Sequence, residues 1–405
     1  MKKILIRCIC IIAACATLAM SAGCSLTKTT VSSEIDETVS YVSGDKNSNT
    51  GASSGSADAS SDNKGGAGNV VSGSGDNTVH NAGEINNSSE EKLKGTLELQ
   101  IFVGGYGSEC WEYAISEFQK LQPNLEINAH LDTNVSTYKN TGKIYEMPVL
   151  LSTYGMWYDQ TLFSQKGWSV PKNYTELQSF CKTVKSSGMY PFIYTGQYSG
   201  YLVWGMLMPA VASEALASND TQYFYDVANA ASESVWSDAR FKKVLTKIET
   251  LAKAGYFDPS GLSMNHITSQ AAWLKHNAAL IPNGLWLENE MKSSTPASFK
   301  MRYYPSVLQD AGQKTAVVAT ATSVGIAAKA KNPKAAEAFL RFLYTDKVAA
   351  KFAELCAVPS ATRTDVSKAN LTESAKQVNE MINSSEVTLI SKGSTTWGSV
   401  DATIN

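Results

Sequence analysis

The sequence has 405 residues, of which 43% are hydrophobic and 18% charged, and its formal net charge is −2. At about 150 residues per domain this length allows two or three domains, and the near-neutral charge argues against a dedicated nucleic-acid binder, which usually carries a strongly basic face. Beyond the N-terminus no run of 18 apolar residues occurs, so no membrane span is predicted there.

The first 23 residues have the pattern of a secretory signal. Lys2, Lys3 and Arg7 precede an apolar stretch over residues 9–20, which matches the charged and hydrophobic regions of such a signal. The stretch ends in SAGC at residues 21–24, which resembles the lipobox of bacterial lipoproteins, whose cysteine is lipidated after cleavage. We therefore expect residues 1–23 to be removed and Cys24 to carry the lipid. The alternative is an ordinary signal peptide with a cysteine at this position by chance.

Residues 24–93 are expected to form the lipidated cysteine and a tether. The segment is dominated by Ser, Gly, Asn, Asp, Thr, Ala and Glu, with one aromatic residue, Tyr41, and no proline. It contains too little apolar mass to offset the entropy of ordering and is predicted to be disordered. A flexible coil of about 65 residues reaches about 45 Å, which suits a tether between a membrane and a folded domain.

Four of the seven cysteines fall in the predicted signal or at its end. The remaining three are Cys110, Cys181 and Cys356. They are dispersed, and no CxxC pair or His/Cys cluster predicts a zinc site. We expect them to be small core residues, and a disulfide between two of them is left open.

From about residue 94 the composition is globular, and it begins with a predicted strand–helix–strand unit. Residues 96–103 alternate apolar and polar side chains and predict a strand, and 104–107 a turn. A helix with an apolar face follows from Ser108, a suitable cap, and ends before Pro123. Residues 125–128 predict the second strand.

Further helices are predicted where caps and apolar periodicity coincide. They are expected after Asn173, over 238–254, after the Asn332-Pro333 pair, and after Thr345. Residues 278–281 and 316–318 read as short buried strands. Strands that alternate with helices predict an α/β fold.

No motif requires catalysis. The four histidines are isolated from motif partners, and no HExxH, Walker or kinase signature occurs. A GxGxxG pattern begins at Gly105 but has Cys110 in the third glycine position. Paired carboxylates for glycoside hydrolysis cannot be located among 37 acidic residues. We therefore predict no enzyme, no cofactor and no metal.

Aromatic residues are the most informative candidates for a binding site. They gather at residues 154–158, 190–204, 286 and 397. Aromatic faces stack on sugar rings, while Asn, Asp and Gln bond the hydroxyls. The alternative is that an aromatic side chain at helical or strand spacing belongs to the core. Tyr106 lies between two glycines and Trp286 lies near Gly284, both at turns, which favours the binding role for these two.

The chain resembles the extracellular solute-binding lipoproteins of carbohydrate ABC transporters, the maltose-binding-like group (family 1). Five stretches match that family in order, behind the lipobox. They are the strand and glycine turn at 104–107 with the helix and PNLEI at 123–127, GKIYEMP at 142–148 with MWYDQTLF at 156–163, residues 167–177, AALIPNGLW at 278–286, and NPKAAEAFL at 332–340 leading to VPS at 358–360.

The resemblance implies a two-lobed periplasmic-binding-protein-like fold of type II that closes over a sugar. One lobe would hold residues 95–153 and 312–352, and the other 154–311 and 353–405. Residues at the family's cleft-lining positions are Gly105, Tyr106, Tyr154, Tyr201 or Trp204, Asn283, Trp286 and Trp397. Tyr158 matches a motif tyrosine whose role in the family looks structural.

The sequence departs from the family in the first lobe. Only about nine residues (133–141) separate the second predicted strand from GKIYEMP, where the family has a long stretch with a further strand and several helices. The chain also stops soon after Trp397. We therefore expect an incomplete first lobe, and hypothesise that sugar binding is weak or absent unless a partner completes the lobe.

The resemblance implies a sugar receptor, for an oligosaccharide or an amino sugar, that delivers its substrate to an ABC transporter permease. It would be a monomer, held by Cys24 on the extracellular face of the membrane of a Gram-positive bacterium, with no nucleic-acid partner. Two alternatives are kept: a surface-anchored carbohydrate-active enzyme, and a degenerate or sensor receptor that no longer transports.

Overall fold

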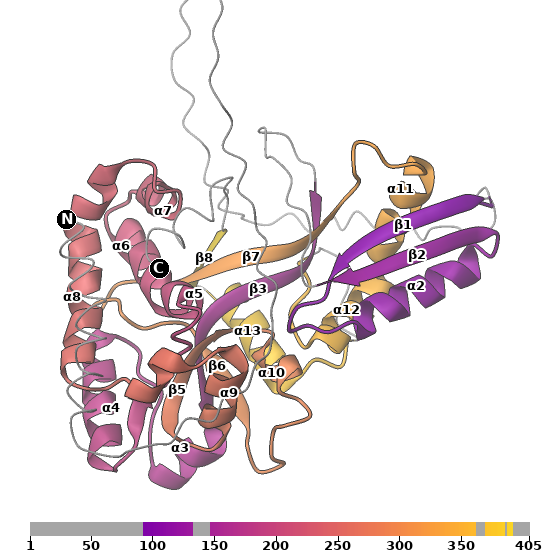
Figure 1. The fold of residues 1–405 in the computed structure, drawn as a ribbon. Helices are drawn as coiled ribbons and strands as arrows, with labels where there is room; N and C mark the ends of the chain where they lie inside the picture. Colours follow the sequence, from indigo (N-terminus) through magenta and orange to yellow (C-terminus); the bar gives the residue numbers. More distant parts are fainter. Residues whose placement is uncertain (1–91, 133–145, 362–368, 385–386, 392–405) are drawn as a thin grey trace, which may run out of the picture. The chain divides into compact units, whose positions relative to one another are not determined.

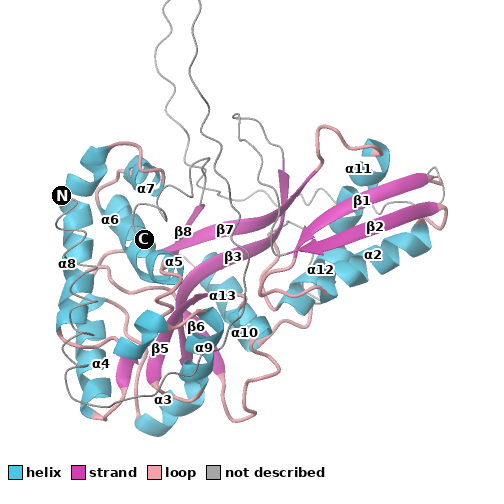
Figure 2. Cartoon of the chain, in the orientation of Figure 1, coloured by secondary structure: helices cyan, strands magenta, loops and turns pink. Residues whose placement is uncertain are grey.

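The computed structural model describes residues 92–132, 146–361, 369–384 and 387–391 (Figure 1). The predicted signal, the tether, Cys24 and Trp397 lie outside these residues. Helices and strands alternate along the described chain (Figure 2), which confirms the predicted α/β class.

The N-terminal unit is the predicted strand–helix–strand. Strands β1 (Gly95–Phe102) and β2 (Leu125–Asp132) pair in parallel over eight residues, and α2 (Glu109–Leu121) connects them. Ser108 occupies the N-cap position of α2, as expected, but its side chain makes no capping hydrogen bond. Acidic side chains in the first turn of α2 instead stabilise the helix by interacting with the positive end of its dipole.

The larger of the two sheets in the described chain has six strands, in the order β4-β5-β3-β7-β8 with β6 also paired to β3. Its strands are β3 (Glu146–Asp159), β4 (Tyr190–Phe192), β5 (Ala278–Gly284), β6 (Met301–Tyr304), β7 (Thr315–Gly325) and β8 (Val387–Ser391). The predicted short strands at 278–281 and 316–318 are thus confirmed within longer ones.

The long strand β3 changes partner along its length. Residues 146–153 pair with β7, and residues 154–159 pair with β5 and β6, all antiparallel. The change falls at 153/154, where the family resemblance puts a lobe boundary. The lobe ranges themselves stay a prediction.

The helices carry the caps that the sequence indicated. The Asn173 side chain accepts a hydrogen bond from the Glu176 N–H (3.0 Å), and that of Asn332 accepts one from the Ala335 N–H (3.3 Å). Gly255, which follows the helix predicted at 238–254, has φ +68°, the left-handed conformation that ends helices at glycine. The α-helices after α2 are α3 (Gln160–Lys166), α4 (Tyr174–Ser186), α5 (Gly200–Leu202), α6 (Met208–Ala217), α7 (Thr221–Ala228), α8 (Ala239–Lys253), α9 (His266–Leu274), α10 (Leu287–Glu290), α11 (Pro333–Leu343), α12 (Asp346–Cys356) and α13 (Glu373–Asn383).

Helices α5 and α6 are joined by a π-helical turn, η1 (Val203–Leu207), and two 3-10 segments, η2 (Glu233–Ser237) and η3 (Pro259–Ser263), occur elsewhere. Among the described residues, the stretch Gly200–Ala217 is long and apolar enough to cross a membrane, but 83% of it is buried inside the fold. Burial on this scale identifies it as a core helix.

Two clusters of buried apolar side chains form the core. One lies among α4, α6, α7, α8 and the six-stranded sheet. The other joins the inner face of β1 and β2 with α2, α11, α12 and parts of β3 and β5. Cys181 belongs to the first cluster and Cys110 and Cys356 to the second, and all three are free and buried, as predicted for small core residues.

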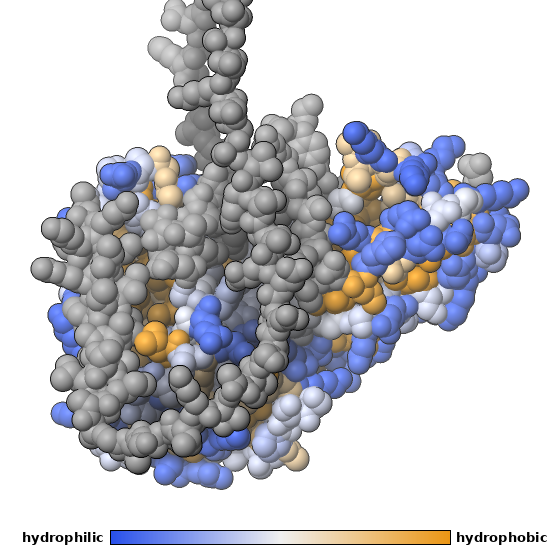
Figure 3. Space-filling view, in the orientation of Figure 1, coloured by the Kyte–Doolittle hydropathy of each residue, from blue (hydrophilic) through white to orange (hydrophobic). Residues whose placement is uncertain are grey.

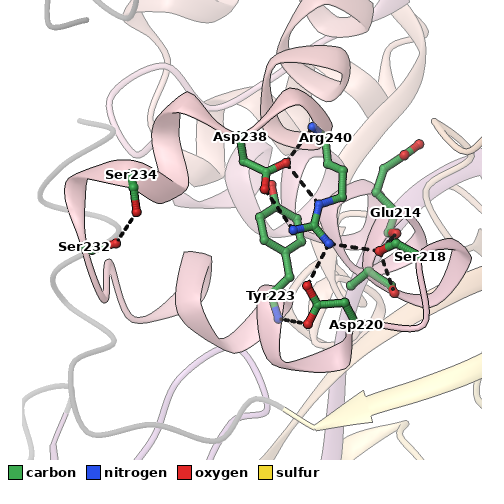
Figure 4. A network of polar contacts seen from close by, with 9 residues as sticks. Glu214, Ser218, Asp220, Tyr223, Ser232, Ser234, Asp238 and Arg240 are labelled. Carbon is green, nitrogen blue, oxygen red and sulfur yellow. Dashed lines mark hydrogen bonds and ion pairs between the residues drawn. The ribbon is translucent and has the colours of Figure 1, made fainter.

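A polar network fastens α7 to α8 at the edge of the first cluster (Figure 4). Arg240 lies with its guanidinium 3.6 Å from the centre of the Tyr223 ring. The same group bonds both Asp238 oxygens (3.0 and 2.8 Å), Asp220 (2.9 Å) and the Ser218 hydroxyl (2.9 Å). The hydrogen bond from Arg240 lowers the pKa of Asp238. The network links neighbouring helices of this region and is structural.

Candidate functional site

Trp286 lies at the centre of a group of aromatic rings that come from four separate segments. Its ring is 5.0 Å from that of Tyr154 at 90°, 5.9 Å from Tyr106 at 85°, and 6.0 Å from Tyr201 at 48°. Tyr154 and Tyr201 are 6.3 Å apart. We call Tyr106, Tyr154, Tyr198, Tyr201 and Trp286 the aromatic cluster. Four of these five were predicted from the sequence as site residues, and the fold brings those four together.

Two glycines make room for the Trp286 ring. A Cβ added at Gly105 would lie 2.5 Å from Cδ1 of Trp286, and one at Gly284 would lie 2.3 Å from Cη2. Such separations are incompatible with any side chain, so the ring can lie against both backbones only because each residue is glycine. Gly105, predicted as a site residue, therefore acts by its lack of a side chain.

Hydrogen bonds hold Tyr106 by its backbone and by its side chain. The Asn289 side chain donates to the Tyr106 carbonyl (2.6 Å), and the Tyr106 hydroxyl donates to Ser152 Oγ (2.7 Å). Burial raises the pKa of Tyr106, so the phenol stays a neutral donor. Asn289 and Ser152 were not identified from the sequence, because single Asn and Ser residues carry no motif.

Tyr154 is positioned by a residue that the sequence did not reveal. The Tyr303 hydroxyl donates to the Tyr154 carbonyl (2.9 Å) and accepts from Thr153 (3.1 Å). A Cβ at Gly155 would lie 2.6 Å from the Tyr303 hydroxyl oxygen, so glycine is required next to Tyr154. The backbone of β3 is thereby fixed where it carries the ring into the aromatic cluster.

Tyr198 is the exposed member of the aromatic cluster. Its ring lies 5.3 Å from that of Tyr201 at 67°, and its side chain is 56% exposed, whereas Tyr201 is 8% exposed. Burial, followed by the nearby charge of Glu290, raises the pKa of Tyr201. The sequence grouped Tyr198 with other aromatic residues but gave no reason to select it; the flanking glycines at 196 and 200 were the available signal.

A carboxylate borders the aromatic cluster. Glu290 lies one helical turn beyond Trp286, and its N–H donates to the Trp286 carbonyl (2.9 Å), so the two side chains share a helix face. Its carboxylate accepts from Gln270 Nε2 (2.7 Å) and pairs with His266 (3.4 Å). The Gln270 carbonyl oxygen is buried and finds no partner among the described residues. The arrangement offers acceptors beside a set of aromatic faces.

Asn283 and Trp204, also predicted as site residues, are deeply buried. Asn283 is 0% exposed, and its side-chain oxygen accepts from the Gly284 N–H (2.7 Å), while its Nδ2 has no partner in the described part of the chain. Trp204 is 2% exposed and belongs to the core beside the six-stranded sheet. Its burial favours a packing role over contact with a ligand. Trp397 and Cys24 lie outside the described residues.

The described residues contain no group of three or more His, Cys, Asp or Glu side chains that could hold a metal ion. The aromatic cluster and its neighbours offer aromatic surface, amide groups and the Glu290 carboxylate.

Comparison with known families gives a match over residues 100–350 to the bacterial extracellular solute-binding proteins. This range covers more than half of the chain and includes every described member of the aromatic cluster. The resemblance read from the five sequence stretches is thereby confirmed.

Two curated proteins are similar in sequence. The diacetylchitobiose binding protein NgcE of Streptomyces coelicolor is 27% identical over 232 residues, 56% of this chain and 48% of NgcE. The multiple sugar-binding protein of Streptococcus mutans is 22% identical over 265 residues, 65% of this chain and 62% of that protein. The matched part of the chain thus spans about half to three fifths of these relatives.

Solved structures share the fold. The apo form of RafE from Streptococcus pneumoniae matches with a TM-score of 0.58 at 18% identity, covering 74% of this chain and 89% of RafE. The GacH receptor of Streptomyces glaucescens, described without ligand and with acarbose, matches with a TM-score of 0.58 at 17% identity, covering 77% and 92%. These matches confirm the two-lobed solute-binding-protein fold.

Proposed function

Because the chain belongs to the family of bacterial extracellular solute-binding proteins, we propose that it is a sugar receptor that binds an oligosaccharide or an amino sugar and delivers it to an ABC transporter permease. The observation that carries the proposal is the aromatic cluster around Trp286, at the residues where the family resemblance expects a sugar. Stacking on aromatic faces with hydroxyls bonded by polar groups is a general mode of carbohydrate binding.

The relatives support a sugar as the ligand. One is named for binding diacetylchitobiose and the other for binding multiple sugars. Glu290, beside Trp286 and Tyr201, supplies acceptor oxygens for hydroxyl or amide N–H groups. The proposed chemistry needs no cofactor and breaks no covalent bond, so the protein is proposed to be a binding protein and not an enzyme.

Intrinsic tryptophan fluorescence of the full chain against a sugar panel that includes chitobiose, raffinose and maltose tests the proposal, followed by isothermal titration of any sugar that responds. Trp286→Ala is expected to weaken binding at least 30-fold, about 2 kcal/mol, as for a central buried aromatic contact. Trp236→Ala is the matched control, because Trp236 packs on Phe241 (5.1 Å), away from the aromatic cluster, and should keep its affinity. Equal affinity in Trp286→Ala and wild type would remove Trp286 from the site.

A second candidate is a degenerate or sensor receptor. It is favoured by the small N-terminal sheet, which among the described residues has only β1 and β2. For a degenerate receptor, no sugar in the panel gives saturable binding to the isolated chain, whereas a sensor receptor binds the sugar and presents that state to a partner protein without transport. Saturable binding would exclude the degenerate receptor, and turnover of a glycoside by the purified chain would instead support the carbohydrate-active enzyme.

The location proposed for the receptor is the outer face of the membrane of a Gram-positive bacterium, as a lipid-anchored monomer. The support is the signal-like N-terminus that ends on Cys24 and the extracellular family description. Incorporation of labelled palmitate into the wild-type chain, and its loss in Cys24→Ala, is the expected result. Equal labelling of both chains would contradict attachment at Cys24.

A further inference from the structure

Two of the three buried thiols face each other, and the binding site uses neither. Cys110 on α2 is 1% exposed and Cys356 at the end of α12 is 0% exposed. The Cys110 side chain lies near enough to Cys356 to raise the pKa of its thiol. The third cysteine, Cys181 on α4, is equally buried but lies in the other core cluster. Cys110 and Cys356 therefore form a candidate pair, and Cys181 is a buried cysteine of the same chain that can serve as a control.

The helices that carry the pair pack directly against each other. The rings of Trp111 and Phe352 meet edge to face at 4.9 Å. Trp111 follows Cys110 in sequence, and Phe352 lies one helical turn before Cys356. The aromatic contact thus sits beside the thiols and holds their helices in register, as a disulfide requires, since its geometry tolerates little backbone movement.

From this placement we infer that Cys110 and Cys356 form a disulfide when the chain folds in an oxidising extracellular environment. The oxidant is an external disulfide, either a protein of the dithiol–disulfide exchange class or a small molecule such as oxidised glutathione. One thiolate attacks the external disulfide and releases one thiol, and the second thiolate displaces the other. The chain loses two electrons and two protons, and the external disulfide gains them as two thiols.

The bond is expected to form during folding and not afterwards. In the folded chain neither sulfur is open to an external reagent. Interaction with the Cys110 side chain, followed by burial, raises the pKa of the Cys356 thiol, which disfavours the thiolate that exchange needs. Reduced protein that has already folded should therefore oxidise slowly.

The disulfide would tie the N-terminal unit to a helix about 240 residues later in the chain, and a cross-link that closes so long a loop removes more conformational freedom from the unfolded state. It would also lie close to the site, because Cys356 is near enough to Tyr106 to influence the pKa of its hydroxyl. The inference does not depend on the proposed sugar ligand.

The test refolds the full chain from denaturant in a reduced/oxidised glutathione buffer and blocks free thiols with an alkylating reagent after denaturation. Peptide mapping by mass spectrometry without reductant should recover the Cys110 peptide joined to the Cys356 peptide, and Cys181 alkylated. Recovery of Cys110 and Cys356 as alkylated thiols would overturn the inference. This measurement needs no variant, so it does not depend on whether a mutant folds.

Thermal unfolding gives the second readout. Adding reductant during refolding should lower the Tm of wild type and of Cys181→Ala alike, by about 5–10 °C. In the double variant Cys110→Ala/Cys356→Ala the reductant should leave the Tm unchanged. A reductant effect that persists in the double variant, or is lost in Cys181→Ala, would contradict the assignment of the pair.

Discussion

The strands of the N-terminal unit and those of the six-stranded sheet are buried to different extents. In the sheet, β5 has all seven residues buried. In the N-terminal unit, β1 and β2 bury one face against α2, α11 and α12, and leave the other face exposed with Glu98, Asn128 and His130 bonded across it. Parallel strands are usually covered on both faces, so the N-terminal unit depends on a single packed face.

Exposed apolar side chains mark the same difference. Phe102 is 50% exposed, Leu131 43% and Leu121 37%, all in or next to β1, β2 and α2. The space-filling view shows apolar surface along this part of the molecule (Figure 3). The N-terminal unit and the six-stranded sheet therefore differ in how far their apolar side chains are removed from water, and so in how much each of these side chains stabilises the fold.

The largest expected effect comes from substituting a phenylalanine in the buried sheet. Phe192 on β4 is 0% exposed and stacks on Phe257 at 5.0 Å. Phe192→Ala should lower the free energy of unfolding by about 3–5 kcal/mol, because it removes apolar contact and leaves a cavity. The matched change Phe102→Ala, at 50% exposure on β1, should cost less than about 1 kcal/mol. Urea denaturation checks both, and equal losses would remove the contrast between the two regions.

A smaller effect is expected at one of the hydrogen bonds that the loop after β1 makes with the rest of the fold. The side chain of Asn289, in α10, donates a hydrogen bond to the carbonyl of Tyr106, in the loop after β1 (2.6 Å). Asn289→Ala should cost about 1–2 kcal/mol, because the Tyr106 carbonyl is left without this partner. Asn128→Ala, which removes a bond on the exposed face of β2, is the control and should change stability by about 0.5 kcal/mol or less. Chemical denaturation of both variants separates the cases, and the idea fails if the control is the more damaging change.

The smallest expected effect is a loss of stability at low pH. Hydrogen bonds from Lys243 and then Lys247 lower the pKa of Asp310, so its folded-state pKa lies below the unfolded one. Its stabilising contribution is present above about pH 4 and is lost as the pH falls through the folded-state pKa. Because Asp310 is 45% exposed, solvent screening limits the contribution to less than about 1 kcal/mol.

The N-terminal unit contains a comparable carboxylate, and measuring Tm as a function of pH tests both. There, hydrogen bonds from Lys120 and then Lys347 lower the pKa of Glu117 to about 2. Asp310→Asn and Glu117→Gln should each flatten the fall of Tm between about pH 4 and pH 2. Acid limbs identical to that of wild type in both variants would show that neither ion pair contributes.

Local structure was predictable where short-range chemistry decides it. The strand–helix–strand at 95–132, the caps at Asn173 and Asn332, and the strands at 278–281 and 316–318 follow from alternation, capping and helix periodicity within a few residues. The length of β3 and its change of partner were not predicted, because pairing depends on segments up to about 180 residues away along the chain.

The site was predicted in part for a similar reason. Tyr106 and Trp286 carried a local signal, glycine at a turn, whereas Asn289, Tyr303 and Glu290 carried none. Trp204 and Trp286 were both predicted as site residues, yet one is buried in the core and the other lies at the centre of the aromatic cluster. Solvent exposure is a property of the assembled fold and cannot be read from a residue type.

The α/β class, the family and the helices and strands with a clear cap or periodicity follow from the sequence alone, because these rest on local periodicity, capping and ordered motifs. Only the tertiary structure decided that Gly105 and Gly284 flank the Trp286 ring and that Cys110 meets Cys356. Those contacts join residues far apart in the chain, and packing across the whole core selects which of them form.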